Sequence, residues 1–531
     1  MKNFSILNPK GRDPKSMGIN RLQFSNTFSG LEISRILRIE SIHAGGKMTT
    51  SNLADFIALD EETILHRLDI FEDLLNCDGL IDFLRDVILP GVQGLSTMRT
   101  SSDEEGVNFV DQFQSVKQLN TYVQFIEKSH ESLAKLDFKS EGLHNFAKKV
   151  ATIYNSEDYE NIKVNLPKLI VNIESDIKSV TVGVNLDDSM NIINMGIVSL
   201  NEERYKPNKL IDKLIRPGFT HNDKYRLITP LQPVYSAIAG MDIIHKYEMN
   251  RSFNNSINKL LKGSVKSMPK EISEYMKSQT QFLVDLASEI CFLVAGYGMI
   301  IKLKNNNMPV CKPTVSQNRV THMENLYHPA LLDTTMPEDI VLNSVSFDDN
   351  GMLYILTGAN SGGKSVFMHS VGIAQVLFQL GLYVPADKAV MLPVDHVCLH
   401  LPSDSAVSNV TGRLEYECKA LNEIIKTVTS KSLVLIDEVF SSTSAHDGSV
   451  LTEELLKYFA KTGCKGIFST HIHGLSAPRI NEMTTGVKVD TLVAVVDEGK
   501  RTYRVSRQEP EGLSHARDIA IKYGLLVDID E

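Results

Sequence analysis

Apolar residues recur at helical spacing in two long stretches of the chain. Ile64, Leu68 and Phe71 fall on one face of a helix, and the same spacing continues through residues 50–150. The pattern returns in residues 208–304, where basic positions occupy one side of the predicted helices. We therefore predict that most of the first 300 residues are helical.

Shorter apolar runs interrupt and follow these helices. Residues 162–166, 180–185 and 197–200 alternate or run apolar with β-branched side chains, which is typical of strands. We expect a strand-rich segment at about 161–202. From residue 310 onward, short apolar runs alternate with helical patterns and glycine turns, which indicates an α/β region with a mostly parallel sheet.

Turn-forming residues mark the boundary between the two patterns. Residues 305–309 read Asn-Asn-Asn-Met-Pro, which punctuates the chain. Residues 1–48 show no clear period and form a short N-terminal module or irregular arm. We predict a multidomain fold with this arm (1–48), a helical region with a small β-rich tip (49–309) and an α/β domain (310–531).

Composition is that of an ordinary globular protein. The chain has 531 residues, of which 42% are hydrophobic and 23% charged. The N-terminus has no apolar signal segment, and the longest apolar stretch, residues 290–301, is too short to span a bilayer. Six cysteines without a C-x-x-C pair indicate reduced thiols rather than a zinc site or a disulfide framework. We predict a cytoplasmic protein with no membrane partner.

Charge is unevenly distributed along the chain. The net charge is −10, yet residues 204–278 hold 14 Lys/Arg and 6 Asp/Glu, an excess of eight positive charges. A basic segment in an acidic protein is expected where a polyanion binds. A solvated helical face balanced by acidic neighbours explains the charges equally well. Charge alone leaves both interpretations open.

Residues 358–365 carry the clearest chemical signal. They match G-x-x-x-x-G-K-[ST], in which glycines allow backbone N–H groups to surround phosphates. An apolar run (353–357) precedes the loop and a helical pattern (366–382) follows it, so a helix N-terminus would face the anion. We predict that Lys364 reaches the phosphates of ATP and that Ser365 binds Mg²⁺. The predicted nucleotide-binding residues are Gly358, Ala359, Asn360, Ser361, Gly362, Gly363, Lys364 and Ser365.

Two later runs end in polar residues suited to hydrolysis. Residues 433–436 lead into Asp437 and Glu438. At the end of a strand neighbouring the loop, Asp437 would hold Mg²⁺ and Glu438 would polarise the attacking water. Residues 467–470 lead into His471. This histidine either assists at the γ-phosphate or caps a turn.

Together these motifs resemble the C-terminal ATPase domain of the MutS DNA mismatch-repair family over residues 316–527. The loop, the acidic strand and the Thr-Ser-x-x-Asp-Gly segment at 443–448 follow in the family's order. Further matches are Tyr327-His328-Pro329, Tyr383-Val384-Pro385-Ala386, Ser469-Thr470-His471 and Asp518-Ile519-Ala520. The resemblance implies an ABC-type P-loop ATPase that uses ATP and Mg²⁺ and forms a homodimer with composite ATP sites. It also implies that Ile340 stacks on the adenine base.

The resemblance continues more weakly upstream. Residues 50–305 look like the family's lever and clamp, with helices leading out to a strand-rich tip and long helices returning. This places the basic segment 204–278 in or beside the clamp. The resemblance therefore implies sequence-independent contacts between this segment and the DNA backbone.

The chain departs from the family in its reader of mismatches. Only about 50 residues precede the helical region. In the family, an N-terminal reader domain inserts a Phe into the base stack of DNA from an exposed tip, and a Glu follows this Phe two residues later. Phe125-Ile126-Glu127 has this spacing but lies in a helical pattern, so we interpret it as part of an ordinary helix. The chain therefore resembles the ATPase domain, lever and clamp of MutS without the mismatch-reading domain.

A second departure concerns the segment that reaches the partner subunit's nucleotide. Residues 409–413 match this segment, and Gly412 occupies its key serine position. Arg413 either contacts the partner's phosphate or pairs with a nearby glutamate. The residues that could take these roles are Thr411 or Ser408 for the serine, and Glu415 or Glu417 as the partner of Arg413.

The sequence therefore predicts an ATP-dependent DNA-binding protein of MutS type, in which hydrolysis gates a dimeric clamp on mismatched or branched DNA. One alternative is a nucleotide-gated binder of structured RNA, the ribosome or recombination intermediates without mismatch specificity, since A-form helices also present dense phosphates. A transporter-type ATPase is a further alternative, which the long helical N-terminal half disfavours.

Overall fold

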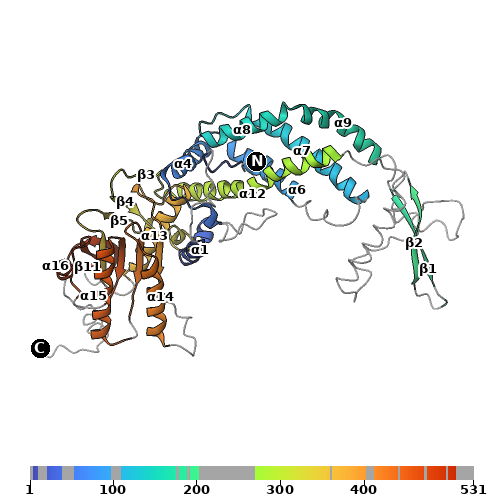
Figure 1. Ribbon diagram of the computed structural model, residues 1–531. Helices are drawn as coiled ribbons and strands as arrows, with labels where there is room; N and C mark the ends of the chain where they lie inside the picture. Colours follow the sequence, from blue (N-terminus) through green and yellow to red (C-terminus); the bar gives the residue numbers. More distant parts are fainter. Residues whose placement is uncertain are drawn as a thin grey trace, which may run out of the picture. The chain divides into compact units, whose positions relative to one another are not determined.

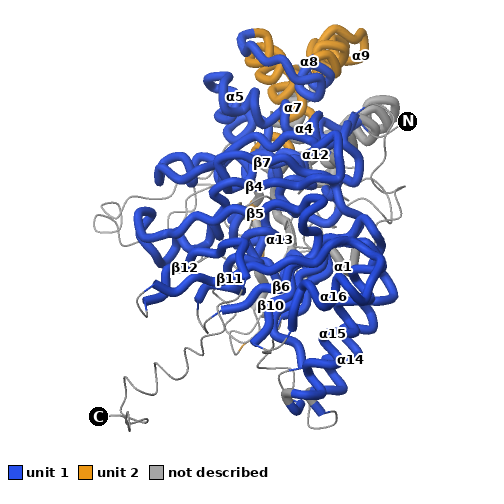
Figure 2. The backbone as a smooth tube through the Cα atoms, turned by 90° about the vertical axis from the view of Figure 1, so that its left-hand side faces the viewer, with its two compact units in different colours: residues 1–89, 135–147, 285–531 blue, residues 90–134, 148–284 orange. Residues whose placement is uncertain are grey.

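The computed structural model of the chain consists of two compact units (Figures 1 and 2). Unit 1 comprises residues 1–89, 135–147 and 285–531, and unit 2 comprises residues 90–134 and 148–284. The predicted boundaries at residues 48 and 309 stay predictions. The structure describes residues 4–9, 21–38, 53–96, 109–174, 179–186, 188, 192–201, 270–358, 362–401, 412–440, 443–471, 475–497 and 500–509.

The first part of unit 1 is helical. It contains α1 (Arg21–Gly30), α2 (Ile33–Ile36), the 3-10 turn η3 (Ala54–Phe56), α4 (Glu61–Asn76), α5 (Leu80–Asp82) and the π-helical turn η4 (Phe83–Ile88). Two further helices, α8 (Glu141–Tyr154) and α12 (Lys270–Asn305), have residues in both units. The Asp60 side chain caps α4 by accepting a hydrogen bond from the Thr63 N–H at 2.9 Å. Ile64, Leu68 and Phe71 are fully buried, which confirms the predicted helical face.

The second part of unit 1 is the α/β region. Its strands are β3 (Thr314–Val315), β4 (Thr321–Leu326), β5 (Asn343–Phe347), β6 (Leu353–Gly358), β7 (Lys388–Met391), β8 (Val397–His400), β9 (Leu433–Asp437), β10 (Lys465–Ser469), β11 (Val489–Asp497) and β12 (Lys500–Arg507). Its helices and 3-10 turns are η7 (Pro329–Asp333), η8 (Pro337–Asp339), α13 (Lys364–Leu380), α14 (Arg413–Thr427), α15 (Ala445–Thr462) and α16 (Ala477–Met483).

These strands form two mixed sheets, which confirms the predicted α/β character. One sheet has six strands in the order β12-β11-β6-β10-β9-β8, and every neighbouring pair is parallel except β11–β12. The other has four strands in the order β3-β7-β4-β5. Parallel strands bring their carboxyl ends to one edge of a sheet, where the predicted polar residues follow them.

Helices cover both faces of the six-stranded sheet. All five residues of β9 are buried. Val434 and Ile436 belong to a hydrophobic cluster with Phe459 of α15, on one face of the sheet. Leu435 points to the other face, where a Cβ added to Gly372 of α13 would lie 2.9 Å from it. Because both faces are apolar and covered, polar chemistry is confined to the ends of the strands.

A buried charge pair anchors residues 4–9 within unit 1. Arg67 on α4 is fully buried, and Glu289 on α12 is 8% exposed. Arg67 donates hydrogen bonds to the carbonyl oxygens of Leu7 (3.0 Å), Phe56 and Leu380 (3.4 Å) and to Oδ1 of Asn8 (2.9 Å). Oε2 of Glu289 accepts from the N–H groups of Ile6 (2.7 Å) and Leu7 (3.2 Å). Burial lowers the pKa of Arg67 to about 10, and the negative charge of Glu289 opposes that shift.

Replacing Arg67 by methionine is expected to destabilise the protein by about 3–5 kcal/mol, because it leaves buried carbonyl groups without their donor and removes the positive charge that interacts with the buried Glu289 carboxylate. Urea denaturation of the full chain measures the loss. The matched control is Arg85→Met, because Arg85 is exposed and pairs only with Asp82 and Asp86 among the ion pairs of the described residues. Equal stability of Arg67→Met and the wild type would contradict the expected role of Arg67.

The described part of unit 2 contains helices and a β-hairpin. Its elements are α6 (Leu89–Ser96), which begins at the unit boundary, α7 (Phe109–Leu133), α9 (Glu157–Glu174), β1 (Ser179–Leu186) and β2 (Ile192–Asn201). β1 and β2 pair antiparallel, so the strands predicted at 180–185 and 197–200 are confirmed. The strand predicted at 162–166 is wrong. Ile162 and Leu166 are each 4% exposed, one helical turn apart on α9, so their burial follows the helical period.

The Phe-x-Glu sequence lies inside α7 as an ordinary helical segment. Phe125 is 3% exposed, and a Cβ added to Gly91 would lie 2.3 Å from its ring. Glu127 forms an ion pair with Lys163 of α9 at 2.7 Å. The helical interpretation of residues 125–127 is confirmed.

The apolar part of α12 is longer than the stretch predicted from sequence. By length and composition alone, residues Leu286–Asn305 could cross a membrane. However, 61% of the most apolar window is buried inside the fold. Leu286, Ile290 and Leu293 are fully buried, so this segment serves as a core helix of unit 1.

Candidate functional site

The glycine-rich loop joins the carboxyl end of β6 to the N-terminus of α13, as the sequence predicts. Gly358 has φ 120° and Gly363 has φ 89°, both in the region that favours glycine. A Cβ at Gly358 would lie 2.7 Å from the carbonyl oxygen of Ala494, so a side chain is excluded there. Residues 359–361, which include the predicted site residues Ala359, Asn360 and Ser361, lie outside the described residues.

Lys364 places a positive charge at the start of α13. It is 4% exposed, and its Nζ donates a hydrogen bond to the carbonyl oxygen of Gly358 at 2.9 Å. Burial lowers the pKa of Lys364, and the carboxylates of Glu438 and Asp437 oppose that shift. A helix N-terminus with a buried ammonium group attracts an anion.

The acidic residues lie at the same edge of the sheet as the loop. Asp437 ends β9 and is 2% exposed. The prediction that β9 neighbours β6 directly is wrong, because β10 lies between them and pairs with both strands. Ser469 of β10 lies opposite Leu356 of β6 on one side and opposite Asp437 of β9 on the other. Two strand spacings, roughly 10 Å, therefore separate the loop strand from the acidic strand.

His471, Glu438 and Lys364 meet beyond the ends of these strands. Nε2 of His471 contacts Oε1 of Glu438, and Nδ1 of His471 lies 3.4 Å from Nζ of Lys364. The side chains of His471 and Glu438 are 37% and 35% exposed, so both face open space. The three predicted catalytic residues are thus brought together, although they are spread over 108 positions of the sequence.

Three buried polar atoms at this edge have no hydrogen-bond partner within the described part of the chain. They are Oγ1 of Thr357, Oδ1 of Asp437 and Oγ of Ser469, at the ends of β6, β9 and β10. A buried polar atom normally has a partner, and leaving one without costs about 1–3 kcal/mol. Such a group of acceptors is suited to a hydrated cation or a polar ligand.

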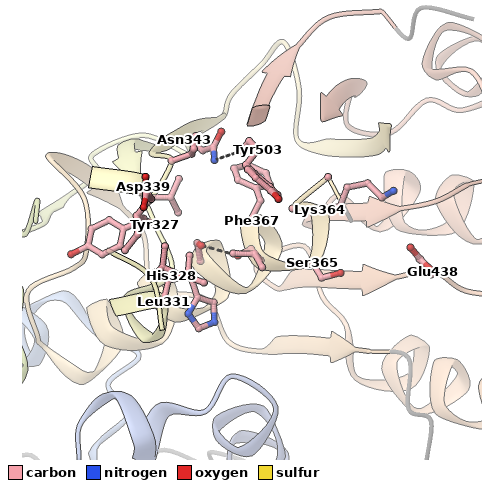
Figure 3. A pocket seen from close by; sticks show the side chains of 18 residues that line it. Tyr327, His328, Leu331, Asp339, Asn343, Lys364, Ser365, Phe367, Glu438 and Tyr503 are labelled. Atoms are coloured by element: carbon pink, nitrogen blue, oxygen red, sulfur yellow. Dashed lines mark hydrogen bonds between the residues drawn. The ribbon is translucent and has the colours of Figure 1, made fainter. Parts of the chain in front are cut away.

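A cavity of about 570 Å³ extends away from these residues (Figure 3). Lys364, Ser365 and Glu438 lie at one end, and Tyr327 and Asp339 lie at the other. The remaining lining residues that bear on the argument are Ile340, Phe367, Asn343, His328 and Tyr503. Ile340, the predicted base contact, is 7% exposed and lines the cavity. The volume suits a ligand of drug or nucleotide size.

Tyr503 is a lining residue that sequence reasoning missed. It lies on β12 with φ 56° and is 49% exposed. Asn343 on β5 holds the strand at Tyr503 and just after it: Nδ2 donates to the Tyr503 carbonyl oxygen at 3.1 Å, and Oδ1 accepts from the Val505 N–H at 2.7 Å. A Cβ at Gly363 would lie 3.4 Å from the Tyr503 ring, so the ring borders the loop. The sequence around Tyr503 shows only an aromatic residue in a strand-like run, which does not distinguish a binding residue from an ordinary strand residue.

His328 gives the cavity wall a neutral imidazole. Burial lowers its pKa to about 4, and the nearby His369 and Arg35 lower it further, while Glu32 opposes them. The rings of His328 and His369 lie 6.0 Å apart. At neutral pH this end of the cavity therefore carries no imidazolium charge.

Several predicted features lie outside the described residues. They are the basic segment up to residue 269, Ser408, Thr411 and the side chain of Arg413. Gly412 precedes α14 and caps it without a side-chain hydrogen bond. Glu415 pairs with Lys419 at 2.6 Å, and Glu417 accepts a hydrogen bond from the Phe440 N–H at 2.9 Å. Both glutamates thus have partners on described residues.

Two family models match the chain and together span most of it. MutS domain V matches residues 354–521, and the MutS2 N-terminal domain matches residues 59–306. The chain belongs to the MutS family. The domain V match contains the glycine-rich loop, Asp437, Glu438 and Tyr503, and the MutS2 match runs from the start of α4 to the end of α12.

Individual MutS relatives are similar over a smaller part of the chain. "DNA mismatch repair protein MutS" of Staphylococcus epidermidis is 32% identical over 31% of this chain and 19% of its own length. The protein of the same name from Clostridium perfringens is 33% identical over 31% of this chain and 19% of its own length. That from Prochlorococcus marinus is 30% identical over 39% of this chain and 23% of its own length. The chain thus aligns with roughly a fifth to a quarter of the length of these MutS proteins.

Proposed function

We propose that this chain is an ATP-dependent DNA-binding protein of MutS type, in which Mg²⁺-dependent ATP hydrolysis gates a dimeric clamp on DNA. One observation carries the proposal. A single cavity is lined by Gly362, Gly363 and Lys364 of the glycine-rich loop and by Glu438, and Asp437 and His471 lie next to these side chains. In this proposal residues 310–531 form the ATPase domain and residues 49–309 the lever and clamp.

The residues of the loop fit a nucleotide with its metal. Gly358 and Gly363 have the positive φ angles that a phosphate-binding loop requires, and the buried ammonium of Lys364 would balance the charge of the phosphates. Ser365 lines the cavity, and the buried Oδ1 of Asp437 has no partner within the described part of the chain, so both suit Mg²⁺. Bound Mg²⁺ would neutralise charge on the transferred phosphoryl group.

Each side chain near the loop then has a distinct role. Glu438 positions the attacking water and accepts its proton, and His471 orients the Glu438 carboxylate through the contact between Nε2 and Oε1. Lys364 binds the β- and γ-phosphates. Tyr503, whose ring borders the loop, and Ile340 line the same cavity and provide apolar surfaces for the adenine base.

The DNA and dimer parts of the proposal rest on charge and on the family. The eight excess positive charges of residues 204–278 suit phosphate backbones. The relatives are named as DNA mismatch repair proteins, and their similarity supports DNA as the polyanion. We further propose a cytoplasmic homodimer whose ATP sites are composite.

Equilibrium binding of the full chain to three labelled DNAs tests the DNA part. The DNAs are a matched duplex, the same duplex with one mismatch and a four-way junction, with and without ATP at fixed salt. We expect binding to at least one DNA, with an affinity that changes with ATP. A mismatch preference of about tenfold, roughly 1.4 kcal/mol, would assign mismatch reading to this chain. Absence of binding to all three would refute the DNA assignment.

A charge-matched pair of variants tests the basic segment. Replacing Lys259, Lys262 and Lys266 by alanine is expected to weaken DNA binding roughly tenfold and to flatten its salt dependence. The control replaces Lys419, Lys426 and Lys457, which lie on α14 and α15, and removes the same charge. Equal losses in both variants would assign the effect to net charge instead.

The MutS2 match over residues 59–306 favours a second candidate function. In it, the same ATPase gates binding to structured RNA, the ribosome or recombination intermediates without mismatch specificity. A labelled RNA hairpin added to the binding series separates the two. Tight, ATP-sensitive RNA binding with no binding to DNA would select this candidate.

A further inference from the structure

The turn that follows β9 has an unusual backbone. Glu438 has φ 48° and Phe440 has φ 59°, so two of three consecutive residues are left-handed without being glycine. Non-glycine residues rarely adopt this conformation and keep it only when surrounding contacts hold them. The turn carries Glu438, so the contacts that hold it also determine where the Glu438 carboxylate lies.

Two hydrogen bonds fix this turn, one at each left-handed residue. The Glu438 N–H donates to the carbonyl oxygen of Ser469 at 3.1 Å, which ties the turn to β10. The Phe440 N–H donates to Oε2 of Glu417 at 2.9 Å. The second contact differs from the first because it comes from a side chain on α14, outside the sheet.

The Glu417 side chain is buried against the turn instead of facing solvent. It is 6% exposed, while its neighbour Glu415 on the same helix is exposed and pairs with Lys419. The negative charges of Glu417 and Asp437 both raise the pKa of His400 at the end of β8, against a larger lowering by burial. Glu417 therefore lies near the carboxyl ends of β8 and β9, beside the proposed site.

We propose that Glu417 is a positioning residue for hydrolysis: its carboxylate holds the Phe440 N–H and thereby keeps Glu438 directed at His471 and the cavity. This inference rests on the proposed ATPase function. Removing the acceptor leaves a buried N–H without a partner and releases a left-handed turn. A displacement of about 1 Å at a catalytic group can lower turnover by as much as 100-fold.

The test compares three variants of the full chain with the wild type. Glu417→Ala removes the acceptor, and Glu417→Gln keeps a carbonyl oxygen in the same place. Glu415→Ala is the matched control on the exposed face of α14. ATP affinity is measured by equilibrium dialysis with labelled ATP, and kcat and KM by steady-state phosphate release.

We expect Glu417→Ala to lower kcat by at least roughly tenfold while Kd for ATP stays within about twofold, because the phosphate-binding loop is untouched. Glu417→Gln should restore kcat to within about threefold of the wild type, since an amide oxygen also accepts from an N–H. Glu415→Ala should match the wild type. If Glu417→Ala does not fold, Glu417→Asp, whose carboxylate is one methylene shorter, should show the same loss of kcat.

Three results would overturn the inference. They are a normal kcat in Glu417→Ala, an equal loss of kcat in Glu417→Gln, and a parallel loss of ATP affinity and kcat, which indicates a general structural role. Failure of the underlying function looks different: the wild type would hydrolyse no ATP, or Glu438→Gln would turn over normally. The two failures are therefore distinguishable.

Discussion

Lys364→Ala is expected to raise the Kd for ATP at least about 100-fold, roughly 2.7 kcal/mol. The physical reason is the position of its ammonium group, which is buried at the first residue of α13 and held at 2.9 Å from the Gly358 carbonyl oxygen. Bound phosphates in a partly dehydrated site need this charge, because water does not screen them there. Equilibrium dialysis with labelled ATP measures the change.

The control for this variant is Lys388→Ala, which removes an exposed lysine from β7 in the other sheet. It should bind ATP as the wild type does. Wild-type affinity in Lys364→Ala would show that the loop does not hold phosphates through this side chain, and the nucleotide assignment would fail with it.

Glu438→Gln is expected to keep ATP binding within about twofold and to lower kcat at least about 100-fold. The amide preserves the size of the side chain and can still contact Nε2 of His471, but it no longer accepts a proton from water. Steady-state phosphate release gives kcat, and dialysis gives the affinity of the same preparation.

Glu482→Gln, an exposed change on α16, serves as the control and should leave both quantities unchanged. Normal turnover in Glu438→Gln would remove Glu438 from the water-positioning role. A loss of binding instead of turnover would assign Glu438 to nucleotide or metal binding.

Features that depend on neighbouring residues were predictable from the sequence. The loop at 358–365 lies between β6 and α13 because its glycines, lysine and serine are contiguous and their flanking patterns are local. The helical face of α4 and the strands of the hairpin were predictable for the same reason. The strand predicted at 162–166 failed because a short apolar run suits strand and helix alike, and packing along α9 decided it.

Features that depend on distant residues were not predictable. Tyr503 borders the loop only because Asn343, 160 residues earlier, holds β12 through the Tyr503 carbonyl oxygen and the Val505 N–H. Glu417 reaches Phe440 only because α14 is placed beside the end of β9. The order of β6, β10 and β9 likewise depends on which strands pair, and the spacing of motifs along the chain carries no such information.

The sequence by itself determined the chemistry available to this MutS-family chain: the glycine-rich loop at 358–365, two carboxylates, a histidine and a basic segment. Those are properties of residue types and short spacings. The tertiary structure alone decided that Lys364, Glu438 and His471 converge, that Tyr503 and Ile340 line one cavity with Lys364 and Glu438, and that the Glu417 carboxylate accepts from the Phe440 N–H. Convergence needs parallel strands to end at one edge, and only long-range pairing and packing produce that arrangement.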